Sequence, residues 1–250
     1  MSPAHFDYLL RLADNPLILG QRLAQWCGHG PVLEEDLALA NTALDLIGQA
    51  RLLLTYAGAC EGKGRDEDQL AFLRGERAFR NWTLVELPNG DFGRSVLRNF
   101  LYSACQLHRW DGLQQVRDAQ LAGIAAKSLT ETRYHLRHAS DWVVRLGDGT
   151  EESHARMQTA LDQLWPYTAE LFHDDAVEND AAAAGIGPAA SSLRAPWEAT
   201  VRPLLAEATL AIPAGTPFLS RGKQGLHSEH MGHLLAEMQS MQRSFPGARW

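Results

Sequence analysis

Residues 36–57 read DLALANTALDLIGQARLLLTYA, and residues 120–146 read QLAGIAAKSLTETRYHLRHASDWVVRL. Both stretches have the length and the apolar periodicity of long helices. Each also carries a fragment of the pattern by which four-helix bundles hold two metal ions, in which two helices supply a Glu and two others supply a Glu-x-x-His pair. The two stretches therefore predict an all-α, four-helix bundle with an incomplete metal pattern.

The metal pattern lacks a ligand on each of these helices. The first offers Asp45 followed three residues later by Gly48, and the second offers Thr132 followed by His135. A glycine has no side chain that could ligate, and Glu131 lies one residue out of register, so it points about 100° away around the helix. We therefore expect no catalytic residue, no bound cofactor and no metal in this chain, with Asp45, Gly48, Thr132 and His135 as degenerate remnants.

Composition excludes several classes of protein. The chain has 250 residues, a formal charge of −7, 45 % hydrophobic and 21 % charged residues, which is typical of a globular protein. Without a concentrated stripe of Lys and Arg, a nucleic-acid role is disfavoured. No signal peptide and no membrane span is evident, so we expect a cytoplasmic protein. Cys27, Cys60 and Cys105 are widely spaced and are expected to be reduced and structural.

Helical periodicity and breakers predict one domain over residues 1–250. The expected helices cover about residues 5–27, 33–60, 67–85, 92–116, 119–146, 151–173, 194–210 and 226–243. Pro166 predicts a kink or a restart, and residues 174–192, the least periodic part, are expected to form a connection or an excursion. The helix over 33–60 is apolar on nearly every side, which is typical of a buried helix.

Polar residues within these helices leave two interpretations open. Asn41, Asp45 and Gln49 are spaced i, i+4 and i+8, so they could form a remnant metal face or, as we favour, a buried hydrogen-bonded seam. Glu131, which shares a helix with His135 and His138, could join a mononuclear metal site. We favour a Glu–His pair with satisfied imidazoles on an exposed face.

A second histidine cluster lies near the C-terminus. His227, His230 and His233 drift around a helix by about 60° per step, so the three cannot share one compact metal site, although two of them could. The segment from Arg221 to His227 is basic and glycine-rich and enters a helix, which is a weak pattern for binding phosphate on backbone N–H groups.

Five segments together carry a resemblance to a known family. The chain strongly resembles the C subunits of bacterial ring-1,2-phenylacetyl-CoA epoxidases over nearly its whole length. The segments that carry it are residues 36–51, 133–137, 145–150, 225–230 and 246–250. The resemblance implies a ferritin-like four-helix bundle with additional shorter helices.

The resemblance also implies a role and partners. It implies a non-catalytic, structural C subunit in a hetero-oligomer with a related catalytic A subunit that carries the di-iron centre. A small B subunit and a reductase using NADPH, flavin and an iron–sulfur centre complete the implied oxygenase, which epoxidises phenylacetyl-CoA in phenylacetate catabolism. This chain would meet phenylacetyl-CoA only through the complex.

Two rival functions remain. The chain could itself be a metal-dependent oxygenase with a sparse site of Asp45, Glu131 and His135. It could alternatively be a CoA-ester recognition module that uses the loop from Arg221 to His227.

Overall fold

The computed structural model describes residues 3–215 and 218–248 and forms two compact units, residues 1–88 with 221–250 and residues 89–220. The described residues contain helices and one isolated bridge between Arg221 and Leu226, and they include no strand. The prediction of an all-α chain is confirmed. The single-domain prediction stays a prediction, and Trp250, which ends the last segment of the resemblance, lies outside the described residues.

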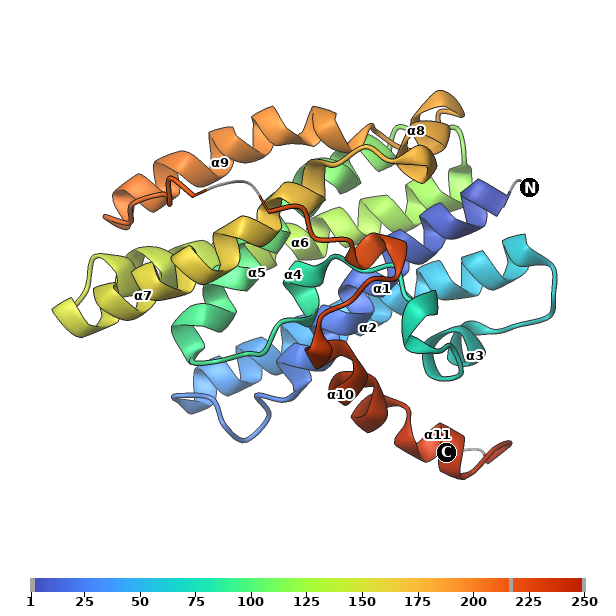
Figure 1. Cartoon of the computed structure of the whole chain (residues 1–250), viewed down its shortest axis with the longest axis horizontal. Coiled ribbons are helices and arrows are strands. Elements are labelled where there is room, and N and C mark those ends of the chain that lie inside the picture. The colour runs from blue at the N-terminus through green and yellow to red at the C-terminus, as the bar shows by residue number, and fades with distance from the viewer. Residues whose placement is uncertain (1–2, 216–217, 249–250) are drawn as a thin grey trace. The chain divides into compact units, whose positions relative to one another are not determined.

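A pair of long helices forms the base of the first unit. Helix α1 (Pro3–Ala24) packs along α2 (Leu33–Glu61), as Figure 1 shows in dark and light blue. The Asp36 carboxylate accepts hydrogen bonds from the backbone N–H of Gly28 (2.8 Å) and of Gly30 (3.0 Å), which fixes the loop between the helices. Gly62 ends α2 in the left-handed conformation that favours glycine.

The rest of the first unit departs from the predicted helix over residues 67–85. The chain forms α3 (Glu67–Phe72), a 3₁₀ turn η1 (Glu76–Ala78) and α4 (Thr83–Glu86). Arg74 explains the break, because its buried guanidinium binds the carboxylate of Asp14 on α1 and the backbone carbonyl of Ala78 at 3.0 Å. A long-range ion pair therefore overrides local helix propensity here.

The C-terminal helix predicted over residues 226–243 is also divided. The structure has a 3₁₀ turn η4 (Gly222–Gln224), then α10 (Glu229–Met238) and α11 (Ser240–Ser244). The Gln239 side chain donates to the backbone carbonyls of Ala71 and Arg74, at 3.1 and 3.0 Å, so the junction of α10 and α11 is held against the turn after α3.

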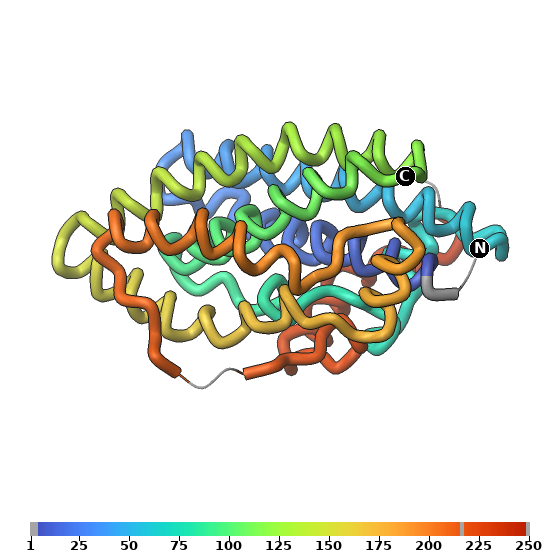
Figure 2. Tube along the Cα trace, turned by 90° about the horizontal axis from the view of Figure 1, so that it is seen from above, coloured from blue at the N-terminus to red at the C-terminus, as the bar shows by residue number. Residues whose placement is uncertain are grey.

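The second unit is built on another long pair. Helix α5 (Phe92–Leu113) packs along α6 (Ala119–Gly147), and Figure 2 shows both in green beside the orange α9 (Arg194–Glu207). The indole N–H of Trp197 on α9 donates to the Leu101 carbonyl of α5 at 3.0 Å. Among the described residues, four helices are longer than twenty residues: α1 and α2 in the first unit, and α5 and α6 in the second.

The segment after α6 tests two smaller predictions. Helix α7 (Glu151–Leu164) gives way to a 3₁₀ helix η2 (Trp165–Phe172), so the restart predicted at Pro166 is confirmed. The predicted connection over residues 174–192 is partly wrong, because it contains α8 (Ala176–Ala183), capped by Asp175, and a 3₁₀ turn η3 (Ala190–Leu193). Buried Glu178 on α8 lies 3.5 Å from the guanidinium of Arg109, which fixes this short helix on α5.

Helix α2 is long and apolar enough to cross a membrane by length and composition alone. Core helices of water-soluble proteins meet the same criterion, and α2 packs along α1. Its predicted burial on every side is nevertheless wrong. Leu39, Leu46 and Leu53 are buried, whereas other large apolar side chains of the same helix are exposed.

Candidate functional site

An exposed apolar face runs along α2. Leu33 and Leu44 are 72 % and 66 % exposed, and the spacing of the exposed apolar residues places them on one side of the helix. The members of this face, called the α2 face below, are Leu33, Leu37, Leu44, Ile47 and Leu52. Exposed apolar groups gathered along one helix are typical of a surface that another protein covers.

The predicted metal-remnant residues of α2 lie beside this face. Asp45 and Gly48 are both half-buried, and a Cβ built on Gly48 would meet no atom within 4 Å. Gln49 is only 1 % exposed, whereas Asn41 is exposed. The stripe Asn41–Asp45–Gln49 therefore runs from the surface into the core, and the prediction of a seam buried along its whole length is wrong.

The predicted residues of α6 are distributed over two sides of that helix. Thr132 and His135 are buried, and the His135 ring meets the edge of the Tyr134 ring at 6.3 Å. Glu131 pairs with Lys127 one turn away. The His138 ring stacks on Tyr134 at 6.2 Å. His135 is buried, so the predicted exposed face is wrong for this residue, whereas the pairing of Glu131 with a histidine stays a prediction.

Metal-binding chemistry has little support in either unit. In the described part of the chain, no group of three or more His, Cys, Asp and Glu side chains is arranged to hold a metal ion. At the four remnant positions, glycine offers no ligand and a threonine hydroxyl is a poor one beside carboxylate and imidazole. That the chain carries no metal stays a prediction.

Sequence reasoning missed a buried polar stripe on α5. Arg98, Tyr102, Gln106 and Arg109 recur at helical spacing and are at most 2 % exposed. The Gln106 amide donates to the Tyr102 hydroxyl at 3.0 Å, and the Arg98 guanidinium donates to the Asn89 side chain at 2.6 Å. Burial raises the pKa of Tyr102 above its ordinary value, so its hydroxyl stays protonated. The i, i+4, i+8, i+11 spacing was the available signal.

The basic C-terminal loop is packed rather than open. Lys223 is buried, and a Cβ on Gly222 would lie 2.5 Å from the Asn81 carbonyl oxygen. The backbone N–H of Ser228, at the start of α10, donates to the Glu86 carboxylate at 2.6 Å. The chain's own carboxylate therefore occupies the helix N-terminus that sequence suggested for phosphate, and the structure does not support that interpretation.

Glu86 is the centre of this packing. Its carboxylate also binds the Asn81 amide (2.8 Å) and Nδ1 of His227 (2.7 Å), and both charged side chains are fully buried. The backbone carbonyl of Glu86 accepts two hydrogen bonds from Arg22 on α1. Burial alone would lower the pKa of His227, but the hydrogen bond and charge of Glu86 outweigh it and raise that pKa above its ordinary value. His227 is thus a structural histidine in an ion pair, and it is not available as a metal ligand.

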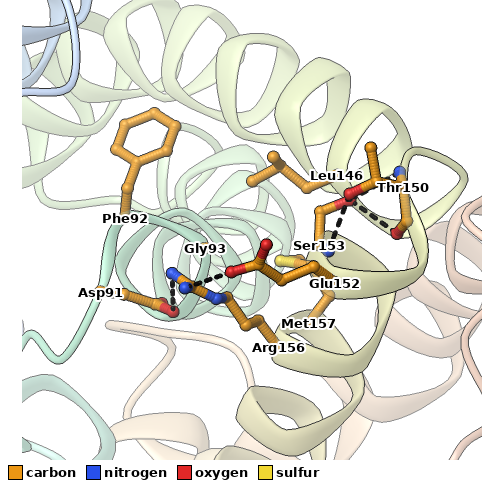
Figure 3. A pocket seen from close by; sticks show the side chains of 9 residues that line it. All are labelled: Asp91, Phe92, Gly93, Leu146, Thr150, Glu152, Ser153, Arg156 and Met157. Carbon is orange, nitrogen blue, oxygen red and sulfur yellow. Dashed lines mark hydrogen bonds and ion pairs between the residues drawn. The ribbon is translucent and has the colours of Figure 1, made fainter.

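The second unit has a shallow pocket at the start of α5 and α7. Figure 3 shows its lining, where Arg156 lies between Glu152 and Asp91 while Thr150 and Ser153 bond to each other. Its volume of about 240 Å³ is below that of ordinary ligand sites, and its polar groups bind one another. We assign it no ligand.

Comparison with known proteins identifies the family. The whole chain, residues 1–250, matches the family described as phenylacetic acid catabolic protein. The chain belongs to this family. A curated member, the C subunit of the 1,2-phenylacetyl-CoA epoxidase of Escherichia coli (strain K12), is 50 % identical over 243 residues, which are 97 % of this chain and 98 % of that protein. The family resemblance stated from the sequence is confirmed.

Membership of the phenylacetic acid catabolic protein family agrees with the helical architecture. The relative is named as one subunit of an epoxidase, so proteins of this kind work beside partner subunits.

Proposed function

We propose that this chain is the non-catalytic, structural C subunit of a multicomponent oxygenase. The assembly converts phenylacetyl-CoA to its ring-1,2-epoxide in aerobic phenylacetate degradation, in the cytoplasm. The name and the 50 % identity of the relative support the reaction, and the incomplete metal pattern supports the non-catalytic role. The di-iron centre would belong to the catalytic A subunit, and NADPH, flavin and iron–sulfur chemistry would belong to a reductase.

The α2 face is the observation that carries the structural role. Burying an exposed leucine side chain contributes about 1.5–3 kcal/mol, so a face with five large apolar residues can support a stable interface. Interfaces of obligate partners exceed about 2,000 Å² and resemble a protein core in composition. We assign this face to the catalytic A subunit.

A structural subunit helps catalysis by holding its partner's helices in place. Metal ligands on facing helices must stay within about 0.5 Å of their working geometry, and packed neighbours supply that rigidity. On this proposal the chain has no chemistry of its own, and it touches phenylacetyl-CoA only through the complex. The assembly also includes a small B subunit.

Reconstitution tests the proposed function. We expect oxygen-dependent turnover of phenylacetyl-CoA by the catalytic subunit and reductase to fall about tenfold or more when this chain is omitted. Without the supporting packing, the catalytic groups of the partner are displaced, and small displacements lower the rate by at least this factor. An unrelated helical protein at the same concentration is the control. Full turnover without this chain would contradict the proposal.

Iron analysis separates the proposal from the rival in which the chain is an oxygenase with Asp45, Glu131 and His135 at its site. After anaerobic loading and desalting, we expect well under about one iron per chain, because Gly48 and Thr132 stand at positions where a di-iron centre needs ligands. The catalytic subunit, loaded in parallel, serves as the positive control. Two tightly held irons per isolated chain would favour the rival.

A further inference from the structure

The outward side of α6 differs in charge from the rest of the chain. Helix α6 contains four cationic residues, counting Lys and Arg, and two acidic ones, so it carries +2 while the remainder of the −7 chain carries −9. Arg133, Arg137 and Arg145 are exposed and recur on one side of the helix together with exposed Tyr134. We call these four residues the α6 face.

The arginines of the α6 face contact aromatic rings. The guanidinium of Arg137 lies 5.8 Å from the ring centroid of Tyr134, and that of Arg145 lies 5.5 Å from the Trp142 ring. Tyr134 is 44 % exposed even though His138 stacks on its ring. Stacking holds an arginine in place while leaving its N–H groups able to bind a carboxylate.

These arginines keep their charge available. Two exposed arginines on other helices pair with a carboxylate one turn away, Arg156 with Glu152 and Arg202 with Glu198. In the described part of the chain, no ion pair is found for Arg133, Arg137 or Arg145, although Asp141 lies one turn from the last two. Arg and Tyr that remain exposed together are typical of interface hot spots.

We propose that the α6 face is an electrostatic docking surface for an acidic patch on the catalytic A subunit, a proposal that rests on the proposed function. Charge complementarity selects the occupant, because a cationic face on an otherwise acidic chain attracts carboxylates and orients the encounter. None of the described pockets is lined by residues of this face, which suits a protein surface better than a CoA ester. The α6 face affects the association rate and the register of the two subunits. The apolar α2 face instead determines how long the complex lasts before it dissociates.

The test measures association kinetics of the full-length chain with the purified catalytic subunit from about 50 to about 500 mM NaCl. We expect Arg133→Glu/Arg137→Glu to slow association about tenfold or more at low salt, with a small change in dissociation rate and convergence with wild type at high salt. The matched control, Arg156→Glu/Arg202→Glu, makes the same charge change on α7 and α9 and should retain the wild-type rate. Circular dichroism confirms that each variant is folded.

The outcomes separate the two proposals. Wild-type binding with an unchanged rate in the Arg133→Glu/Arg137→Glu variant overturns the docking surface and leaves the structural role intact. No binding of the wild-type chain to the catalytic subunit overturns both. Free CoA is added as a competitor, and slowed association by CoA that depends on Arg133 and Arg137 would make the face a ligand site and overturn the proposal. The proposal is also overturned if the chain associates with itself and the Arg133→Glu/Arg137→Glu variant abolishes that self-association.

Discussion

Replacing Glu86 with alanine should lower the free energy of unfolding by about 3–5 kcal/mol, because it leaves the buried imidazolium of His227 without its counter-charge. The same change removes the acceptor for the Ser228 N–H and for the Asn81 amide. Urea unfolding followed by circular dichroism measures the loss. The expected size is well above that of an average single substitution because three groups lose one partner together.

The matched control is Glu152→Ala, which removes an exposed carboxylate paired with Arg156 and should change stability by less than about 0.5 kcal/mol. The double variant Glu86→Ala/His227→Ala should be less destabilised than the sum of the single variants, since it leaves no unpaired charge. Equal stability of Glu86→Ala and wild type would show that the buried network contributes nothing.

The pH dependence of this pair has a definite sign. Both ring nitrogens of His227 face acceptors, Oε2 of Glu86 and the Phe79 carbonyl oxygen at 3.2 Å, so the folded protein favours the imidazolium. Because Glu86 raises the pKa of His227 in the folded state, the stabilisation is complete below the ordinary value of 6.5 and is lost as pH rises through the raised pKa. Wild type should therefore lose stability toward alkaline pH more steeply than His227→Gln.

The elements that sequence predicted well are those with local signals. Gly62 ends α2, Asp118 caps α6 and Thr150 caps α7, and each acts on residues within one turn of itself. The continuous helix over residues 67–85 was wrong because Arg74 binds Asp14, sixty residues earlier, and no local pattern reports such a pair. The C-terminal loop was misread for the same reason, since Glu86 lies far from Ser228 in sequence.

The candidate site was harder to predict than the fold. Periodicity shows that α2 is apolar on several sides, but it cannot distinguish a side that packs on α1 from a side left for another chain. The α5 stripe was visible as spacing, yet only the structure shows that Arg98 and Arg109 are buried. The α6 face could not be recognised from the sequence alone. Only the structure shows that Arg137 contacts the Tyr134 ring and that Arg145 contacts the Trp142 ring.

The substitution Leu37→Asp/Leu44→Asp on the α2 face should weaken binding to the catalytic subunit at least about a hundredfold, which corresponds to about 2.7 kcal/mol. Each change removes an apolar side chain that the partner would bury and leaves a carboxylate to be desolvated at the interface. Both leucines are exposed in the chain by itself, so its own fold should be retained. Isothermal titration calorimetry measures the affinity, and turnover of the reconstituted complex should fall in parallel.

The control for that substitution is Leu226→Asp, which places the same charge at an exposed leucine elsewhere in the first unit and should bind the catalytic subunit as wild type does. The salt dependence of binding distinguishes the two surfaces. The weakening caused by substitutions on the α2 face should persist at high ionic strength, whereas the effect of replacing the α6 arginines should appear mainly at low ionic strength. Wild-type affinity of Leu37→Asp/Leu44→Asp would show that the exposed leucines of α2 lie outside the interface, and the structural role would then need a different surface.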